Sequence, residues 1–345
     1  MKNLDRLLDV YQQDERTKRI VKALESSTPK RLQLVGMVGA QDSFVMSATF
    51  LSSQGSHLII SNSKEEAAYL QNNLSNLLGK KQVHFFPDSF KRPMFFEVLN
   101  TNNVLQRTEI ISKISRPESK GNIVVTYPAA LFEKVVAPKV LDENRLDIIK
   151  GQNMDVDFII EVLIEYGFER VDFVYEPGQF SIRGGIVDIF SYGNEWPYRV
   201  ELFDEEIESI RTFHPTTQLS QQNIARVAII PNINTKFSKD QKVSLFSVLA
   251  ENTTIWIQNF ELLIDRLQMS FEKAEEFAKT ISSTNETELA EVFRDRAFIL
   301  PKDVVQDVEG LSLIVLNNVK QMFPIDEKIT YTSKPQPSLI KTLIS

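Results

Sequence analysis

One stretch of this chain has the residue types and spacing of a phosphate-binding loop. Residues 32–35 form an apolar run that predicts a strand, residues 36–43 have the sequence GMVGAQDS, and residues 44–51 are apolar and compatible with a helix. A Walker A site requires a strand, a glycine-containing loop and a helix in that order, because backbone N–H groups of the loop then point at phosphate oxygens. The chemistry suggested by this arrangement is nucleotide binding.

The loop keeps only part of the phosphate-binding pattern. Gly36 and Gly39 are present. However, Gln41 stands where a working loop needs a late glycine, and Asp42 stands where it needs the lysine that reaches the β and γ oxygens. A carboxylate beside a triphosphate repels it by about 1 kcal/mol at 4 Å in water. Ser43 alone cannot hold a magnesium nucleotide. We therefore expect a degenerate loop that binds no cofactor and serves as an ordinary strand-to-helix connection.

Other residues capable of catalysis or metal binding form no recognisable set. The three histidines, His57, His84 and His214, lack a histidine at i,i+4 spacing and a nearby pair of carboxylates. No cysteine is present, which excludes disulfides, thiol catalysis and cysteine-ligated metals. The sequence therefore predicts no catalytic residue and no metal site.

A second informative segment, residues 173–218, carries dense signals for antiparallel strands. Residues 180–190 alternate around a Gly-Gly pair that suits a bulge or tight bend. In the next strand the period of two gives Tyr198, Val200 and Leu202 one buried face. Arg199 and Glu201 share the opposite face. Such a pair of charges is either solvated or faces a protein partner.

Two stretches of this segment resemble a known family. Residues 176–190, EPGQFSIRGGIVDIF, and residues 199–208, RVELFDEEIE, are similar to a segment of the nucleotide-excision-repair subunit UvrB and of the transcription-repair coupling factors. With gaps, the resemblance extends from about residue 30 to residues 335–337. In that family the segment belongs to a small inserted domain that docks onto UvrA, so the resemblance implies UvrA as the partner.

The resemblance also implies which residues contact UvrA. Ser181 replaces the first arginine of the family's motif, whereas the second is kept as Arg183. Arg183 either contacts the partner or braces the bend at Gly184-Gly185. Arginine suits such a contact because its guanidinium group forms forked bonds with a carboxylate. The residues expected to bind UvrA are Arg170, Arg183, Phe190, Arg199 and Glu201.

The degenerate loop separates the two relatives. UvrB carries an intact nucleotide loop, whereas the amino-terminal module of the coupling factors resembles UvrB without that loop and without its DNA-gripping hairpin. Residues 85–93, FFPDSFKRP, and Arg107 also resemble the coupling-factor module. We therefore expect such a module, truncated before the regions that bind RNA polymerase and form an ATP-dependent DNA translocase. Contacts to RNA polymerase and DNA are expected only through those regions.

Composition indicates a folded protein of the cytoplasm. Of 345 residues, 42% are hydrophobic and 25% are charged, which allows a substantial core. The amino terminus lacks the apolar core of a signal peptide, and no run approaches the ~20 apolar residues of a membrane span. No membrane partner is therefore expected. A net charge of −7 also argues against a large footprint on DNA.

The periodicity of apolar residues predicts an α/β fold with an insertion. Strands are expected at 32–35, 58–60, 122–126, 227–230, 254–257 and 311–316, and helices at 3–26, 64–78, 155–166, 238–250 and 260–281. The expected fold is a parallel-sheet domain with a degenerate P-loop, interrupted by a smaller inserted α+β domain. The parallel-sheet, UvrB-like part is expected to comprise residues 1–127 and 221–345, and the inserted UvrA-binding domain residues 128–220.

The expected function is that of a non-catalytic interaction module, which recruits UvrA to stalled transcription complexes for nucleotide excision repair. The alternative is a UvrB-like, ATP-dependent enzyme that verifies DNA damage, and Asp42 weighs against it. A third hypothesis is a structural clamp that holds a motor inactive. The sequence does not decide between recruitment and autoinhibition.

Overall fold

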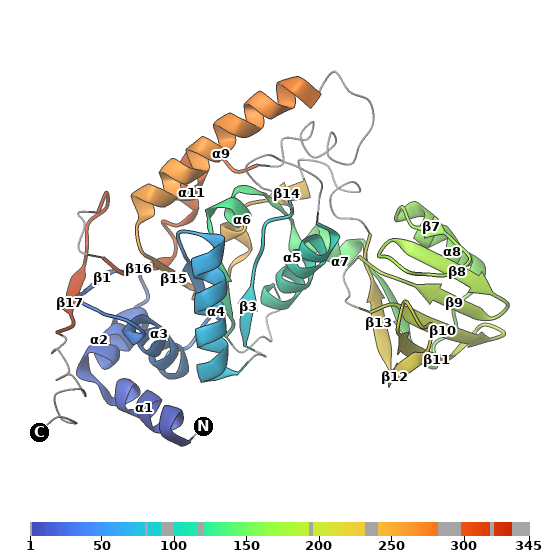
Figure 1. Ribbon diagram of the computed structural model, residues 1–345, viewed down its shortest axis with the longest axis horizontal. Helices are drawn as coiled ribbons and strands as arrows, with labels where there is room; N and C mark the ends of the chain where they lie inside the picture. The colour runs from blue at the N-terminus through green and yellow to red at the C-terminus, as the bar shows by residue number, and fades with distance from the viewer. Residues whose placement is uncertain are drawn as a thin grey trace, which may run out of the picture.

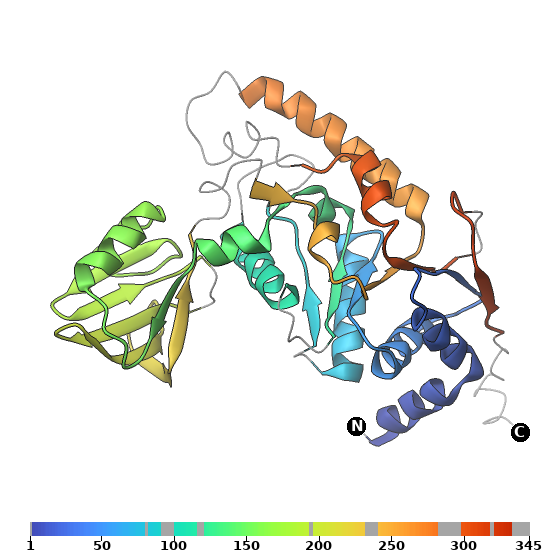
Figure 2. The same cartoon turned by 180° about the vertical axis from the view of Figure 1, so that it is seen from behind.

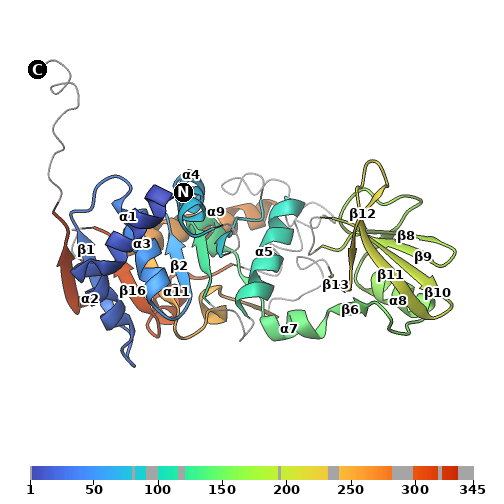
Figure 3. The ribbon, with the colours of Figure 1, turned by 90° about the horizontal axis from the view of Figure 1, so that it is seen from below.

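The computed structural model describes residues 2–79, 82–90, 100–115, 121–192, 196–231, 241–281, 298–317 and 321–332. The described chain forms a larger unit and a smaller unit, which lie side by side along the long axis of the molecule (Figures 1 and 3). The view from behind shows the same separation (Figure 2). Among the described residues, no helix has the length and apolar character needed to cross a membrane.

The larger unit is built on a seven-stranded sheet with the order β17-β1-β16-β15-β2-β4-β3, in which all neighbours are parallel. Every residue of the inner strands β2 and β4 is buried, as expected for a parallel sheet covered by helices. The strands are β1 (Arg31–Val35), β2 (His57–Ile60), β3 (Val83–Phe85), β4 (Ile123–Thr126), β15 (Thr254–Ile257), β16 (Ser312–Val315) and β17 (Glu327–Thr330).

Helices flank this sheet, and several begin at side chains that cap them. Asp14 accepts a hydrogen bond from the backbone of Arg16, and Ser63 accepts one from the backbone of Glu66, so each satisfies an N–H group that the helix leaves free. The helices are α1 (Lys2–Gln13), α2 (Glu15–Leu24), α3 (Gln41–Ser52), α4 (Lys64–Leu78), α5 (Thr101–Ile114), α6 (Pro128–Phe132), α7 (Pro138–Glu143), α9 (Phe260–Ile281) and α11 (Pro301–Asp307).

The smaller unit is a six-stranded sheet with one helix, α8 (Val156–Glu165), packed on it. The sheet is antiparallel except for one parallel pair at its β7 edge. Its strands are β7 (Glu169–Arg170), β8 (Gln179–Arg183), β9 (Ile186–Ile189), β10 (Tyr198–Phe203), β11 (Glu206–Phe213) and β12 (Ser220–Ile224). The expected α/β fold with a separate smaller unit is thus confirmed.

Each unit has its own hydrophobic core. The core of the larger unit includes residues up to Leu141 and again from Ile230 onwards, whereas the core of the smaller unit runs from Leu146 to Ile229. Two antiparallel pairs lie outside the main sheets: β5 (Val135–Val136) with β14 (Lys242–Val243), and β6 (Leu146–Ile149) with β13 (Arg226–Ile229). The boundaries at 128 and 220 stay a prediction, and this packing favours limits near 146 and 230.

Most of the expected elements are present, and two expectations were wrong. The run 227–230, expected to return to the parallel sheet, instead forms β13, which pairs with β6 and contributes to the smaller core. The helix expected at 238–250 is absent from its described part, residues 241–250, which holds β14 and a short 3₁₀ helix (Phe246–Val248). In both cases apolar content was correctly detected, but periodicity did not reveal which core residues 227–230 join, nor that residues 241–250 are not helical over their length.

Candidate protein-binding face

The register of the smaller sheet brings four polar residues into one row across four strands. Ser181 on β8 pairs with Asp188 on β9, Asp188 pairs with Arg199 on β10, and Arg199 pairs with Arg211 on β11. Their neighbours along each strand, such as Phe180 and Val187, belong to the core beneath α8. Since successive side chains of a strand point to opposite faces, the polar row lies on the face away from α8, which we call the outer face.

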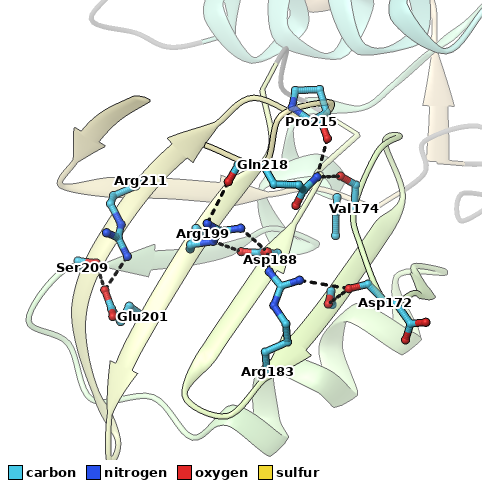
Figure 4. Close-up of polar contacts among 11 residues, drawn as sticks. Asp172, Val174, Arg183, Asp188, Arg199, Glu201, Ser209, Arg211, Pro215 and Gln218 are labelled. Carbon is cyan, nitrogen blue, oxygen red and sulfur yellow. Dashed lines mark hydrogen bonds and ion pairs between the residues drawn. The ribbon is translucent and has the colours of Figure 1, made fainter. Parts of the chain in front are cut away.

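Asp188 is the centre of this outer face (Figure 4). Its carboxylate is fully buried and accepts two bonds from Arg199, from Nε at 2.7 Å and from Nη2 at 2.8 Å. Arg183 donates a further bond to the same carboxylate. The bonds with Asp188 raise the pKa of Arg199, which therefore stays charged. A buried carboxylate held by two guanidinium groups fixes the geometry of both.

A second pair extends the charged row. Arg211 donates a hydrogen bond of 2.7 Å to the carboxylate of Glu201, which also accepts one of 2.9 Å from the hydroxyl of Ser209. Both charged side chains are partly exposed. Glu201 is therefore on the outer face as its alternation with Val200 predicted, and its charge is paired within the chain.

Residues 171–178, which we call the strap, cross part of the outer face. The side chain of Val174 is buried against Phe190 and Phe213, which form a small cluster separate from the core beneath α8. The Ser181 hydroxyl and Arg183 Nη1 donate hydrogen bonds of 2.8 Å and 3.2 Å to the carbonyl of Asp172. These contacts pin the strap to the sheet.

The strap is also tied to the turn between β11 and β12. Gln218, whose backbone is in the left-handed region with φ 58°, donates a side-chain hydrogen bond of 3.0 Å to the carbonyl of Val174. The backbone carbonyl of Gln218 accepts a bond of 3.3 Å from Arg199 Nη1. The buried ion pair is thus connected to the strap through one residue (Figure 4).

The five residues expected to bind a partner occupy different environments. Arg183 keeps 38% of its side chain exposed on the outer face, whereas Arg199 keeps 15%. Phe190 is buried beneath the strap, where a partner cannot reach its ring. Arg170 is exposed on the edge strand β7, but its register beside Phe180 puts it on the face that α8 covers. The structure therefore brings Arg183, Arg199 and Glu201 to the outer face, where Phe190 also lies but is covered by the strap, whereas Arg170 lies on the opposite face.

Three residues important to this face were not among the sequence candidates. Asp188 lies between two buried residues of β9, and its alternation with them could have placed it beside Arg199. Phe173 and Tyr175 are about half exposed, at 50% and 53%, on either side of the buried Val174. Because an irregular segment has no strict periodicity, no pattern in the sequence indicates that these rings are exposed.

In the glycine-containing loop between β1 and α3, Gly36, Gln41 and Asp42 each make a close contact within the chain. A Cβ atom on Gly36, whose φ is +83°, would lie 2.1 Å from the backbone oxygen of Tyr331, so this glycine permits close approach of the chain after β17. The side chain of Gln41 accepts a hydrogen bond of 2.9 Å from the backbone of Val38. Asp42 accepts one of 2.6 Å from the backbone of Ser43. One backbone N–H group of the loop and one in the first turn of α3 are therefore bonded to side chains.

The stretch around residues 85–90 is part of the core of the larger unit. Arg107 is buried and donates hydrogen bonds of 2.7 Å and 2.9 Å to the carbonyls of Pro87 and Ala130. It also bonds to the carbonyl of Glu133, whose pKa is raised by burial. Residues 91–93 of the same motif lie outside the described part of the chain. The motif therefore organises loops that follow β3 and β4.

The three histidines contact other groups of the chain, and His84 lies 3.1 Å from the side-chain oxygen of Asn122. His57 is buried between Trp256, which donates a hydrogen bond of 3.1 Å to its Nδ1, and Ser53. His214 accepts bonds from the backbone N–H groups of the following turn, at residues 216 and 217. In the described ranges, no three side chains of the metal-binding types histidine, cysteine, aspartate and glutamate gather closely enough to hold a metal ion.

Comparison with known proteins agrees with the resemblance inferred from the motifs. Residues 146–234 match the family described as the UvrB interaction domain, and this range coincides with the core of the smaller unit. The chain is 28% identical over 229 residues, 66% of its length, to a transcription-repair-coupling factor of Bacillus subtilis. It is 31% identical over 173 residues, half of its length, to one of Staphylococcus aureus, and 26% identical over 190 residues, 55% of its length, to one of Haemophilus influenzae.

The matched region covers 19%, 14% and 16% of those three relatives, so the chain spans less than a fifth of their length. The expected similarity to the amino-terminal, UvrB-like module of transcription-repair coupling factors is confirmed.

Proposed function

We propose that this chain acts as a non-catalytic interaction module that binds UvrA through the outer face of the smaller sheet, and thereby recruits UvrA to stalled transcription complexes. The observation that carries this proposal is the state of Arg183. Its guanidinium group is exposed, yet a buried carboxylate fixes its position. A charged group that is both accessible and already ordered loses little conformational freedom when a partner binds.

Arg183 and Arg199 take different parts in this proposal. Arg183 contacts the partner, whereas Arg199, which bonds Asp188 twice and Gln218 once, holds the face in shape. Glu201 and Arg211 supply a polar rim, where exposed charges contribute little affinity and mainly guide association. Phe190 supports the strap from below, and Arg170 belongs to this surface only if the partner also wraps around the β7 edge.

The rival function is a UvrB-like, ATP-dependent enzyme. The loop after β1 argues against it, because the amide oxygen of Gln41 binds the N–H of Val38 in the loop and the carboxylate of Asp42 binds the N–H of Ser43 in the first turn of α3. A bound phosphate needs such N–H groups, and it needs a nearby cation. We therefore propose that this chain neither binds nor hydrolyses ATP.

We also propose where the chain acts and which contacts are made by other regions of the coupling factors. The chain works in the cytoplasm, and contacts with RNA polymerase and DNA, together with any ATP-driven translocation, belong to regions of the coupling factors that it does not match. Its own net charge of −7 is consistent with a protein partner.

Calorimetric titration of this chain with purified UvrA tests the proposal. We expect wild type to bind and Arg183→Ala to bind at least about tenfold more weakly, a loss of about 1.4 kcal/mol. Arg226→Ala is the matched control, since Arg226 is an exposed arginine of the same unit paired with Asp147 on β6. No heat of binding with wild type would refute the function, whereas equal loss in both variants would refute the assignment of Arg183.

A further inference from the structure

We propose that the strap and Arg183 form one anchor, which binds a carboxylate side chain of UvrA together with an apolar group beside it, and that Phe173 and Tyr175 supply the apolar contact. This inference rests on the function proposed above. It adds two residues to the binding face and names the chemistry of the partner group.

One guanidinium group is left without a counter-charge of its own within the ion pairs of the outer face. The ion pairs of this face join three guanidinium groups, of Arg183, Arg199 and Arg211, to two carboxylates. Arg199 binds Asp188 with two hydrogen bonds and neutralises it, and Glu201 is neutralised by Arg211. The positive charge of Arg183 is therefore not neutralised, although its guanidinium group also bonds to Asp188.

Arg183 is held beside an aromatic ring. Its guanidinium group lies 5.2 Å from the centre of the Phe173 ring, within the range of a cation–π contact. One edge of the group bonds to Asp188 and to the carbonyl of Asp172. The remaining N–H groups and the exposed part of the side chain are available for the forked bonds that arginine forms with a carboxylate.

The backbone that carries the two exposed rings is held in place before any partner arrives. The backbone N–H groups of Tyr175 and Glu176 donate hydrogen bonds of 2.9 Å and 3.0 Å to the side chain of Gln179. With Val174 buried between them, Phe173 and Tyr175 have a fixed backbone. Exposed aromatic side chains on a rigid segment, next to an arginine, are the composition in which interface energy concentrates.

The partner group is a carboxylate rather than a nucleic-acid phosphate. One surplus charge matches one carboxylate, whereas a phosphate backbone needs a row of cations. The strap also carries the exposed residues Asp172 and Glu176, which would repel a phosphate backbone, with a charge on every nucleotide, more strongly than a single carboxylate. Figure 4 shows the side chain of Asp172 pointing away from Arg183, so it leaves the guanidinium group open to an outside carboxylate.

Binding of UvrA by variants of the strap tests the anchor. We expect Phe173→Ala to lower the affinity at least about tenfold, and Tyr175→Ala to lower it by a smaller factor. Phe158→Ala is the matched control, because Phe158 is 48% exposed but lies on α8, on the other face of the sheet. It should leave the affinity unchanged.

A charge reversal tests the chemistry of the partner group. Arg183→Glu would set a carboxylate against the partner's carboxylate, so its affinity should fall at least about tenfold below that of Arg183→Ala. Equal affinities of these two variants would overturn the carboxylate assignment. Wild-type affinity in both strap variants would overturn the apolar contact, and if Phe173→Ala does not fold, Tyr175→Ala decides this point. Failure of wild type itself to bind UvrA would instead refute the proposed function.

Discussion

Replacement of Asp188 by asparagine should destabilise the smaller unit strongly. The carboxylate is fully buried and holds two arginines, of which Arg199 keeps only 15% of its side chain exposed. Asp188→Asn keeps the shape and one acceptor oxygen but removes the negative charge. Removing one partner of a buried ion pair costs about 3–5 kcal/mol, because the other charge is left uncompensated. Since Arg199 can gain some water, we expect the lower end, about 3 kcal/mol.

Urea unfolding followed by tryptophan fluorescence measures this loss. The chain has two tryptophans, with Trp256 buried in the larger unit and Trp196 beside His214 in the smaller one. In a Trp256→Phe background, the signal of Trp196 reports on the smaller unit. A loss of about 3 kcal/mol corresponds to a change on the order of a hundredfold in the unfolding equilibrium constant.

Glu201→Gln is the matched control for this experiment. Glu201 lies on the neighbouring strand and also pairs with an arginine, but both side chains of that pair are partly exposed. Exposed ion pairs contribute about 0–1 kcal/mol, so this variant should lose less than about 1 kcal/mol. If Asp188→Asn lost no more than Glu201→Gln, the idea that a buried carboxylate organises the outer face would be refuted.

Three further predictions concern the larger unit and the whole chain. Burial lowers the pKa of His57 to about 3, so below the ordinary histidine pKa of about 6.5 the unfolded chain takes up a proton at this residue and the folded chain does not. Between pH 6.5 and 5.5 the free energy of unfolding, measured with urea, should therefore fall by about 1 kcal/mol more in wild type than in His57→Asn. Equal dependence of the two free energies on pH would contradict this. Calorimetry should detect no magnesium-dependent ATP binding by wild type, and saturable binding in the micromolar range would overturn this. Asp42→Lys alone should not restore ATP binding, because Gln41 still fills the loop. Gel shifts at physiological salt should show duplex-DNA binding no tighter than the ~10⁻⁴ to 10⁻⁶ M of non-specific contacts, and tight damage-selective shifts would favour the UvrB-like enzyme.

The sequence predicted the larger unit well because its elements have strong local signals. Helix α4 and strand β15 have the expected bounds, and α9 spans the expected residues 260–281. Uniform burial gives parallel strands continuous apolar runs, and capping residues such as Ser63 mark a helix start. What local patterns could not specify was pairing between distant segments, such as that of β13 with β6.

The candidate face was predicted in part for a similar reason. Alternation along β10 correctly gave Arg199 and Glu201 one face, because a strand has a strict period of two. The partners of these side chains come from other strands, so the sequence did not reveal that Asp188 binds both Arg199 and Arg183. Nor did it reveal that the strap covers Phe190.

Hydrogen–deuterium exchange of the chain with and without UvrA reports both whether UvrA binds and which segments it covers. We predict slower exchange on UvrA binding in the strap, residues 171–178, and in the adjoining turn, residues 215–219. Exchange in α8 and in the loop at residues 36–43 should be unchanged. Protection confined to α8 or to the larger unit, or no protection at all, would refute binding of UvrA to the outer face.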